Sequence, residues 1–126
     1  MKRVEAIIAT ERVSAINDAL KKAGVGGVTV IDGKGRGAGH REEVASARGT
    51  GRFVPEFHSR SSIVVVVDDS KVDAVINAIT QSHYHLFSWE QASASGTGSP
   101  GDGKIFISSV DDAVDIGTKK RGKDAI

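Results

Sequence analysis

Two short runs that favour β-strands, residues 4–9 and 63–67, are each followed within a few positions by an amphipathic helical stripe. The run at 63–67 is Ile-Val-Val-Val-Val, and an unbroken β-branched run of this length indicates a buried strand. The two stripes are Val13, Ile16, Leu20 and Ala23 in the first half and Val72, Val75, Ile76 and Ile79 in the second. A strand followed by a helix, twice in a short chain, leaves few possible folds.

Three further segments complete this pattern. Thr10 is the expected N-cap of the first helix and Gly24 its C-terminal glycine, after which residues 25–31 predict a second strand. Residues 104–107 and 113–116 predict two more strands after the second helix. The order β-α-β, long loop, β-α-β predicts an α+β, ferredoxin-like βαββαβ fold. Because two helices cover only one face of such a sheet, an apolar open face predicts a homo-oligomer.

Composition narrows the possible functions. The 126 residues suit a single domain spanning 1–126, with 39% hydrophobic and 26% charged residues, as in ordinary globular proteins. A net charge of +1 does not favour nucleic acid as a partner. The chain has no cysteine, which excludes disulfides and thiolate chemistry, and no apolar run long enough to insert in a membrane. We therefore expect a cytoplasmic protein.

Residues 33–59 form the longest stretch without a helical or strand period. The stretch contains six glycines and charges of both signs, and loops of this length are usually functional or disordered. Gly35, Arg36 and Gly37 at its start could place backbone donors and a guanidinium beside a phosphate. The alternative for this glycine cluster is a flexible hinge.

A second glycine-rich segment covers residues 97–106, with sequence TGSPGDGKIF. Its glycines allow backbone N–H groups to turn toward an anion, and Lys104 adds a positive charge. The spacing from Gly98 to Lys104 fits G-x-x-x-x-G-K, but Ile105 stands where a P-loop needs Ser or Thr, and a strand is expected to follow. The segment predicts a phosphate cradle without hydrolytic groups; the alternative is a turn with one exposed lysine.

These segments resemble the PII nitrogen-regulatory family over nearly the whole chain, apart from an insertion at 80–96. Residues 101–107 (GDGKIFI), with Thr97 and Val110, are similar to the family's C-terminal signature. The start of the chain (MKRVEAII), residues 34–37 (KGRG) and the end (RGKDAI) resemble the family's first strand, loop start and C-terminus. The glycine-lysine signature is the most specific part of this resemblance.

The resemblance implies a homotrimer that binds adenine nucleotides in the clefts between subunits. It also implies that residues 36–58 act as a flexible regulatory loop toward a target protein, either a membrane transporter or a metabolic enzyme. Arg60 then occupies the effector position at the end of this loop. Together, the motifs and the resemblance give the following nucleotide-binding residues: Ile7, Thr29, Gly35, Arg36, Gly37, Val66, Thr97, Gly98, Gly101, Asp102, Gly103 and Lys104.

Departures from the family pattern change the expected ligand. Asp115 and Gly117 stand where the family offers two arginines to the nucleotide phosphates. Losing two cations and gaining one anion weakens triphosphate binding most, so ADP or AMP is expected to bind at least as well as ATP. Ala38 and Gly39 replace the stretch that carries a glutamine used for magnesium and 2-oxoglutarate. No metal is therefore expected.

The insertion at 80–96 suggests an alternative function. His83 and His85 lie two positions apart, which on a strand would point both imidazoles to one side as metal ligands. The alternative protein is a metal-responsive trimer of the same fold, whereas an extra packed turn explains the insertion without a ligand. No Ser-His-Asp set, cysteine or carboxylate pair indicates catalysis, so we predict that the chain is not an enzyme.

Overall fold

The structure, a computed structural model, describes residues 1–37, 44–46, 49, 51–84 and 103–126. Three short 3₁₀ turns, η1 (Thr10–Arg12), η2 (Asp69–Lys71) and η3 (Gly122–Ala125), accompany the main elements. The helices and strands are β1 (Lys2–Ala9), α1 (Val13–Lys22), β2 (Thr29–Gly35), β3 (Val44–Ala45), β4 (Arg52–Phe53), β5 (His58–Val67), α2 (Val72–Tyr84) and β6 (Gly103–Ser109).

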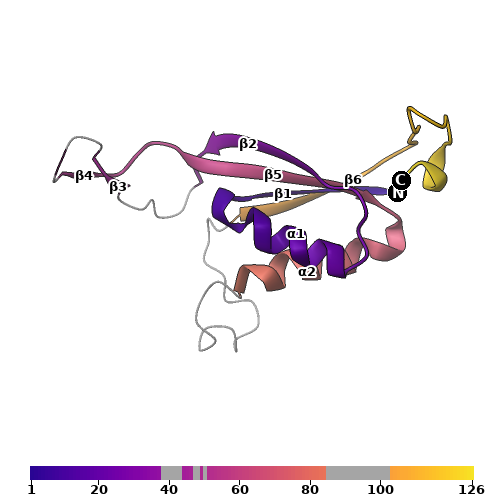
Figure 1. The fold of residues 1–126 in the computed structure, drawn as a ribbon, viewed down its shortest axis with the longest axis horizontal. Helices are drawn as coiled ribbons and strands as arrows, with labels where there is room; N and C mark the ends of the chain where they lie inside the picture. Colours follow the sequence, from indigo (N-terminus) through magenta and orange to yellow (C-terminus); the bar gives the residue numbers. More distant parts are fainter. Residues whose placement is uncertain (38–43, 47–48, 50, 85–102) are drawn as a thin grey trace.

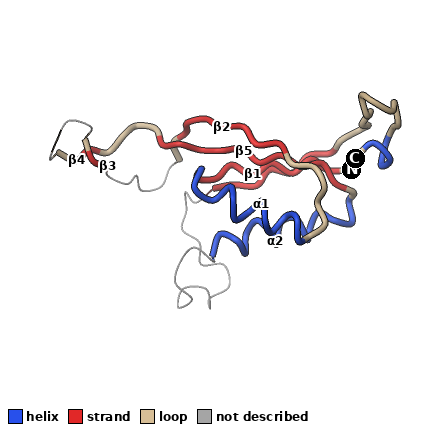
Figure 2. The backbone as a smooth tube through the Cα atoms, viewed as in Figure 1, coloured by secondary structure: helices blue, strands red, loops and turns tan. Residues whose placement is uncertain are grey.

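Four strands form one sheet in the order β2-β5-β1-β6, and every neighbouring pair in it is antiparallel. The two helices lie side by side on one face of this sheet, and its other face is open (Figure 1). Beyond one end of the sheet, β3 and β4 form a separate two-stranded ribbon (Figure 2). This architecture confirms the predicted α+β, ferredoxin-like fold.

The core lies between the sheet and the two helices. Alternate residues of the central strands face the helices, as the two-residue period of a strand requires. From the helices, both stripes predicted from the sequence contribute buried side chains. The core consists of Val4, Ala6, Ile8, Ile16, Leu20, Val25, Ile63, Val65, Val67, Val75 and Ile79. Burying each large aliphatic side chain of this set stabilises the fold by roughly 1.5–3 kcal/mol.

The strand predicted at residues 25–31 lies further along the chain. Val25 is buried in the core, but β2 begins only at Thr29 and continues to Gly35. Gly26 and Gly27 lie between Val25 and the start of β2. Because glycine has no side chain to pack, it weakens a strand at these positions. The loop predicted at 33–59 is correspondingly shorter, because β2 occupies its first three residues and β5 its last two.

No strand forms at residues 113–116, where the sequence predicted one. Val114 makes a single bridge to Arg121, and a turn follows from Ile116 to Thr118. The Asp115 carboxylate accepts hydrogen bonds from the backbone N–H and the hydroxyl of Thr118, at 2.7 and 2.8 Å. Such local side-chain bonds compete with strand pairing. Residues 110–126 instead form a C-terminal arm.

Thr10 does not cap α1, contrary to the prediction. The cap position before η1 is Ala9, and no side chain bonds to its turn. The Thr10 hydroxyl lies 3.1 Å from that of Ser61, which donates to the Asp32 carboxylate at 2.7 Å. Ser61 is 1% exposed, so this chain of hydroxyl groups ties the edge strand β2 to β5 from inside the protein.

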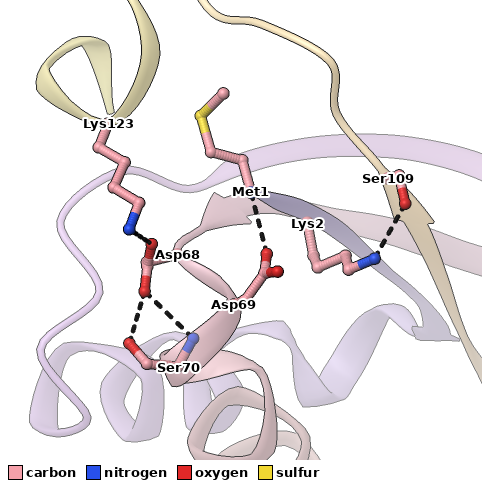
Figure 3. Close-up of polar contacts among 7 residues, drawn as sticks. All are labelled: Met1, Lys2, Asp68, Asp69, Ser70, Ser109 and Lys123. Atoms are coloured by element: carbon pink, nitrogen blue, oxygen red, sulfur yellow. Dashed lines mark hydrogen bonds and ion pairs between the residues drawn. The ribbon is translucent and has the colours of Figure 1, made fainter.

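Two neighbouring carboxylates at the start of α2 hold both ends of the chain (Figure 3). Asp68 pairs with Lys123 of η3 at 2.8 Å and also accepts a hydrogen bond from the Ser70 amide at 3.2 Å. Asp69 pairs with the amino group of Met1 at 2.9 Å. These cations and donors hold the pKa of both carboxyls below its usual value, with Lys123 the largest cause for Asp68. The arm is therefore anchored where β1 begins.

Candidate functional site at the open sheet face

The open face of the sheet is partly apolar. Residues directly opposite each other in a ladder share a face, so the register assigns every outward side chain. Three large apolar side chains on this face are exposed by between 38 and 59%. The outward positions are Arg3, Glu5, Ile7 and Ala9 of β1, His58, Arg60, Ser62, Val64 and Val66 of β5, Thr29, Ile31, Gly33 and Gly35 of β2, and Lys104, Phe106 and Ser108 of β6.

A small polar network interrupts this apolar surface. The Glu5 carboxylate accepts a hydrogen bond from the Ser62 hydroxyl at 2.6 Å and one from the Arg3 guanidinium at 2.7 Å. These two donors hold the pKa of Glu5 below its usual value, and the hydrogen bond from Ser62 is the larger cause, followed by that from Arg3. The network fixes one negative and one positive charge in the middle of the face.

One group of the predicted site residues lies at the end of the face nearest the loop. Ile7 of β1 is directly opposite Lys104 of β6. Arg60 is opposite both Ala9 and Gly33, and a Cβ on Gly35 would lie 3.4 Å from the Arg60 Cγ. Arg36 and Gly37 follow Gly35 directly. We call the set Ile7, Gly35, Arg36, Gly37, Arg60, Gly103 and Lys104 the loop-end group.

The remaining described residues lie toward the other end. Val66 is opposite Arg3, four residues from Ile7 along β1, or about 13 Å. Thr29 stands at the first position of β2, opposite Val64. The C-terminal arm leaves the sheet at this same end, because the Val110 amide bonds to the Met1 carbonyl. We call Thr29, Val66 and the arm with Asp115 and Gly117 the far-end group.

β6 separates the two groups. Lys104 is near its start and the arm follows its end, so they are roughly 20 Å apart in one chain. Figure 1 shows the arm and the β3–β4 ribbon at opposite ends of the sheet. One chain therefore does not bring all the predicted site residues together.

Gly103 has a structural role that the sequence did not indicate. Its φ is +144°, and a Cβ at this position would lie 2.4 Å from the Ile7 carbonyl oxygen. Only glycine fits so close to a neighbouring backbone in this conformation. The glycine before Lys104 thus allows β6 to approach β1 and sets Lys104 opposite Ile7.

The amino-acid sequence is similar to those of known proteins over the whole chain. The family model for nitrogen regulatory protein P-II matches residues 1–120. The chain belongs to the PII family. It is 38% identical to the nitrogen regulatory protein P-II of Azospirillum brasilense, 39% to that of Cereibacter sphaeroides and 36% to that of Rhodospirillum rubrum. Each alignment spans 128 positions and covers the whole of both chains.

Membership of the PII family confirms the resemblance seen in the sequence and the role of a signal-transduction regulator in nitrogen control. The prediction of a regulator rather than an enzyme agrees with this family. No described helix of this PII protein is long and apolar enough to cross a membrane.

Within the loop-end group of this PII chain, Arg36 is already engaged. Its Nη1 lies 2.9 Å from the Glu56 Oε1, and this ion pair joins the two arms of the loop between β2 and β5. Both side chains are more than half exposed. The sequence suggested Arg36 as a phosphate ligand but did not indicate a partner 20 residues away.

Two carboxylates of the C-terminal arm also have hydrogen-bond donors within the arm. Arg121 donates two hydrogen bonds to the Asp112 carboxylate, one of them at 2.9 Å, and is the largest cause of the lowered pKa of that carboxyl. The Thr118 amide is the largest cause of the lowered pKa of Asp115. Asp115 is therefore a carboxylate at neutral pH, as the expected effect on nucleotide phosphates requires.

Several predicted residues lie outside the described part of the chain. They include Thr97, Gly98, Gly101 and Asp102 of the predicted phosphate cradle. His85 of the alternative metal pair also lies outside the described residues. The side chain of His83 is likewise not described. Among the residues that the structure does describe, no group of three His, Asp or Glu side chains could hold a metal ion.

Proposed function

We propose that this PII chain is a cytoplasmic, homotrimeric regulator that binds an adenine nucleotide between copies. In this proposal, residues 36–58 control a target protein, either a membrane transporter or a metabolic enzyme. The observation that carries it is the separation of the loop-end and far-end groups on one sheet face. Neither nucleic acid nor a metal ion has a part in this function.

A cleft that uses both groups needs two copies of the chain. The loop-end group of one copy must meet the far-end group of the next, which is a head-to-tail contact. Head-to-tail contacts close into a ring when the rotation permits, and the family expectation is a ring of three. Such a ring would also cover exposed Ile7, Ile31 and Phe106, for which water is an unfavourable environment.

In this arrangement, Lys104 and Arg60 of one copy supply positive charge to the phosphates. Thr97, Gly98, Gly101 and Asp102 would complete the cradle with backbone donors. Ile7 of the same copy and Val66 of the next offer apolar surface to the base. The arm of the next copy brings Asp115 rather than an arginine. The negative charge of a γ-phosphate would therefore be repelled at this end of the cleft.

The trimer is tested by mass. Light scattering after gel filtration should give three times the chain mass of 13.2 kDa at micromolar concentration. Phe106→Arg should shift the protein toward monomer, because it places a charge on the apolar open face. Ser14→Arg, on the exposed side of α1, is the control and should stay trimeric. If the wild-type protein is a monomer, no cleft between two copies can form and the proposed binding site is wrong.

Nucleotide preference is tested by calorimetric titration with ATP, ADP and AMP. ADP or AMP should bind at least as tightly as ATP, because the Asp115 carboxylate repels the third phosphate. A like-charge contact of this kind costs about 1 kcal/mol even when screened. ATP binding ten times more tightly than ADP would contradict this preference while leaving nucleotide binding itself intact.

A further inference from the structure

The root of the regulatory loop carries a cross-arm ion pair. The ladder between β2 and β5 ends at Gly35 opposite His58. Just beyond this last pair, Arg36 on one arm meets Glu56 on the other, with 2.9 Å between Nη1 and Oε1. The pair therefore joins the two arms at the point where backbone pairing between β2 and β5 stops.

Position connects this ion pair to the proposed nucleotide cleft. Arg36 directly follows Gly35, which packs against the stem of Arg60. The Arg60 stem thus extends from its place opposite Gly33 to Gly35, the residue before Arg36. A phosphate held near Gly35 would lie within reach of the guanidinium that Glu56 now occupies.

We propose that Arg36 exchanges Glu56 for a nucleotide phosphate, and that this exchange releases the two arms of the loop from each other. The inference rests on the proposed function and specifies how the same site is regulated. It makes Glu56 a built-in competitor of the nucleotide and Arg36 the group for which both compete.

The relative strength of the two interactions favours exchange. The Arg36 and Glu56 side chains are 58% and 56% exposed, and ion pairs this open to water contribute little. A terminal phosphate carries more charge than a carboxylate, and like a carboxylate it can bind a guanidinium through two parallel hydrogen bonds. A phosphate beside Glu56 would also be repelled by that carboxylate, which works against both remaining bound to Arg36.

Exchange at Arg36 gives the nucleotide a means of changing the loop. A ligand shifts a conformational equilibrium only if it binds the two states with different affinity, and competition with Glu56 supplies that difference. The coupling is reciprocal. A target protein that holds the arms apart would tighten nucleotide binding, and one that holds them together would weaken it.

Three variants of the full-length protein distinguish competition between Glu56 and the nucleotide from a purely structural role of the Arg36–Glu56 ion pair. Titration with ADP should show tighter binding in Glu56→Gln, by roughly three- to tenfold, because the competitor has lost its charge. Arg36→Gln should bind ADP more weakly by a similar factor. The double variant should match Arg36→Gln alone, because in the proposed competition Glu56 affects the nucleotide through Arg36. Glu11→Gln, exposed in η1, is the matched control and should bind like the wild type.

Hydrogen exchange of the amides in residues 52–57 gives the second readout. In the wild type, ADP should increase exchange there; in Glu56→Gln, exchange should already be high without ADP and change little when it is added. If the wild type binds ADP but Glu56→Gln binds equally or more weakly, the competition is refuted and the proposed function stands. If the wild type binds none of ATP, ADP and AMP, the proposed function fails and this inference fails with it.

Discussion

Replacing Gly103 with alanine should destabilise the protein by about 3 kcal/mol or more. The φ of +144° is strained for any residue with a side chain, and the new Cβ would lie 2.4 Å from the Ile7 carbonyl oxygen. That neighbour is backbone in the centre of the sheet, so it cannot move aside as a flexible side chain would. Urea unfolding followed by circular dichroism measures the loss.

Two other glycines provide controls for this substitution. Gly26→Ala meets nothing within 4 Å and should change stability by less than about 1 kcal/mol. Gly122→Ala also meets open space but has a φ of +64°, so it isolates the cost of the backbone conformation, about 1 kcal/mol. If Gly103→Ala loses no more unfolding free energy than Gly122→Ala, the close approach of β6 to β1 does not contribute to the cost of the substitution.

Lys104→Ala should weaken ADP binding by about 10- to 100-fold, because one charge-assisted contact to phosphate is worth roughly 1.5–3 kcal/mol. Lys104 is exposed on the open face opposite Ile7, so its removal leaves the core intact. The unfolding midpoint and oligomeric state should stay unchanged. Calorimetric titration measures the affinity.

Lys22→Ala removes the same charge from the exposed end of α1 and should bind ADP like the wild type. Equal losses in both variants would indicate a general electrostatic effect rather than a contact. No loss in Lys104→Ala would exclude this lysine from the nucleotide site.

Elements with a strong hydrophobic period were predictable from the sequence. Residues 63–67 and the two helical stripes lie where their patterns placed them, because each buries one apolar face against the same core. Two of the predictions failed because a polar side chain takes a hydrogen-bond partner that the pattern of apolar residues does not show. Asp115 closes a turn where apolar alternation suggested a strand, and the hydroxyl of Thr10 turns to Ser61 instead of capping α1.

The candidate site was predictable only in part, for a similar reason. Ile7 and Lys104 were both identified from the sequence, and the ladder places them directly opposite each other. The separation of Thr29 and Val66 from these two depends on register across the sheet, which no local pattern contains. The pairing of Arg36 with Glu56 depends on how the two loop arms leave the sheet, and sequence spacing does not encode it.

The outer edge of β2 has two unlike halves. Residues 29–31 are Thr-Val-Ile, with Val30 and Ile31 exposed, whereas residues 32–35 are Asp-Gly-Lys-Gly. Exposed β-branched edges attract strands from other molecules, and glycine and charge at an edge discourage them. The second half of this edge thus resists uncontrolled strand addition beside the loop. Misassembly of isolated copies would therefore begin at residues 29–31, the part of the edge farthest from the loop.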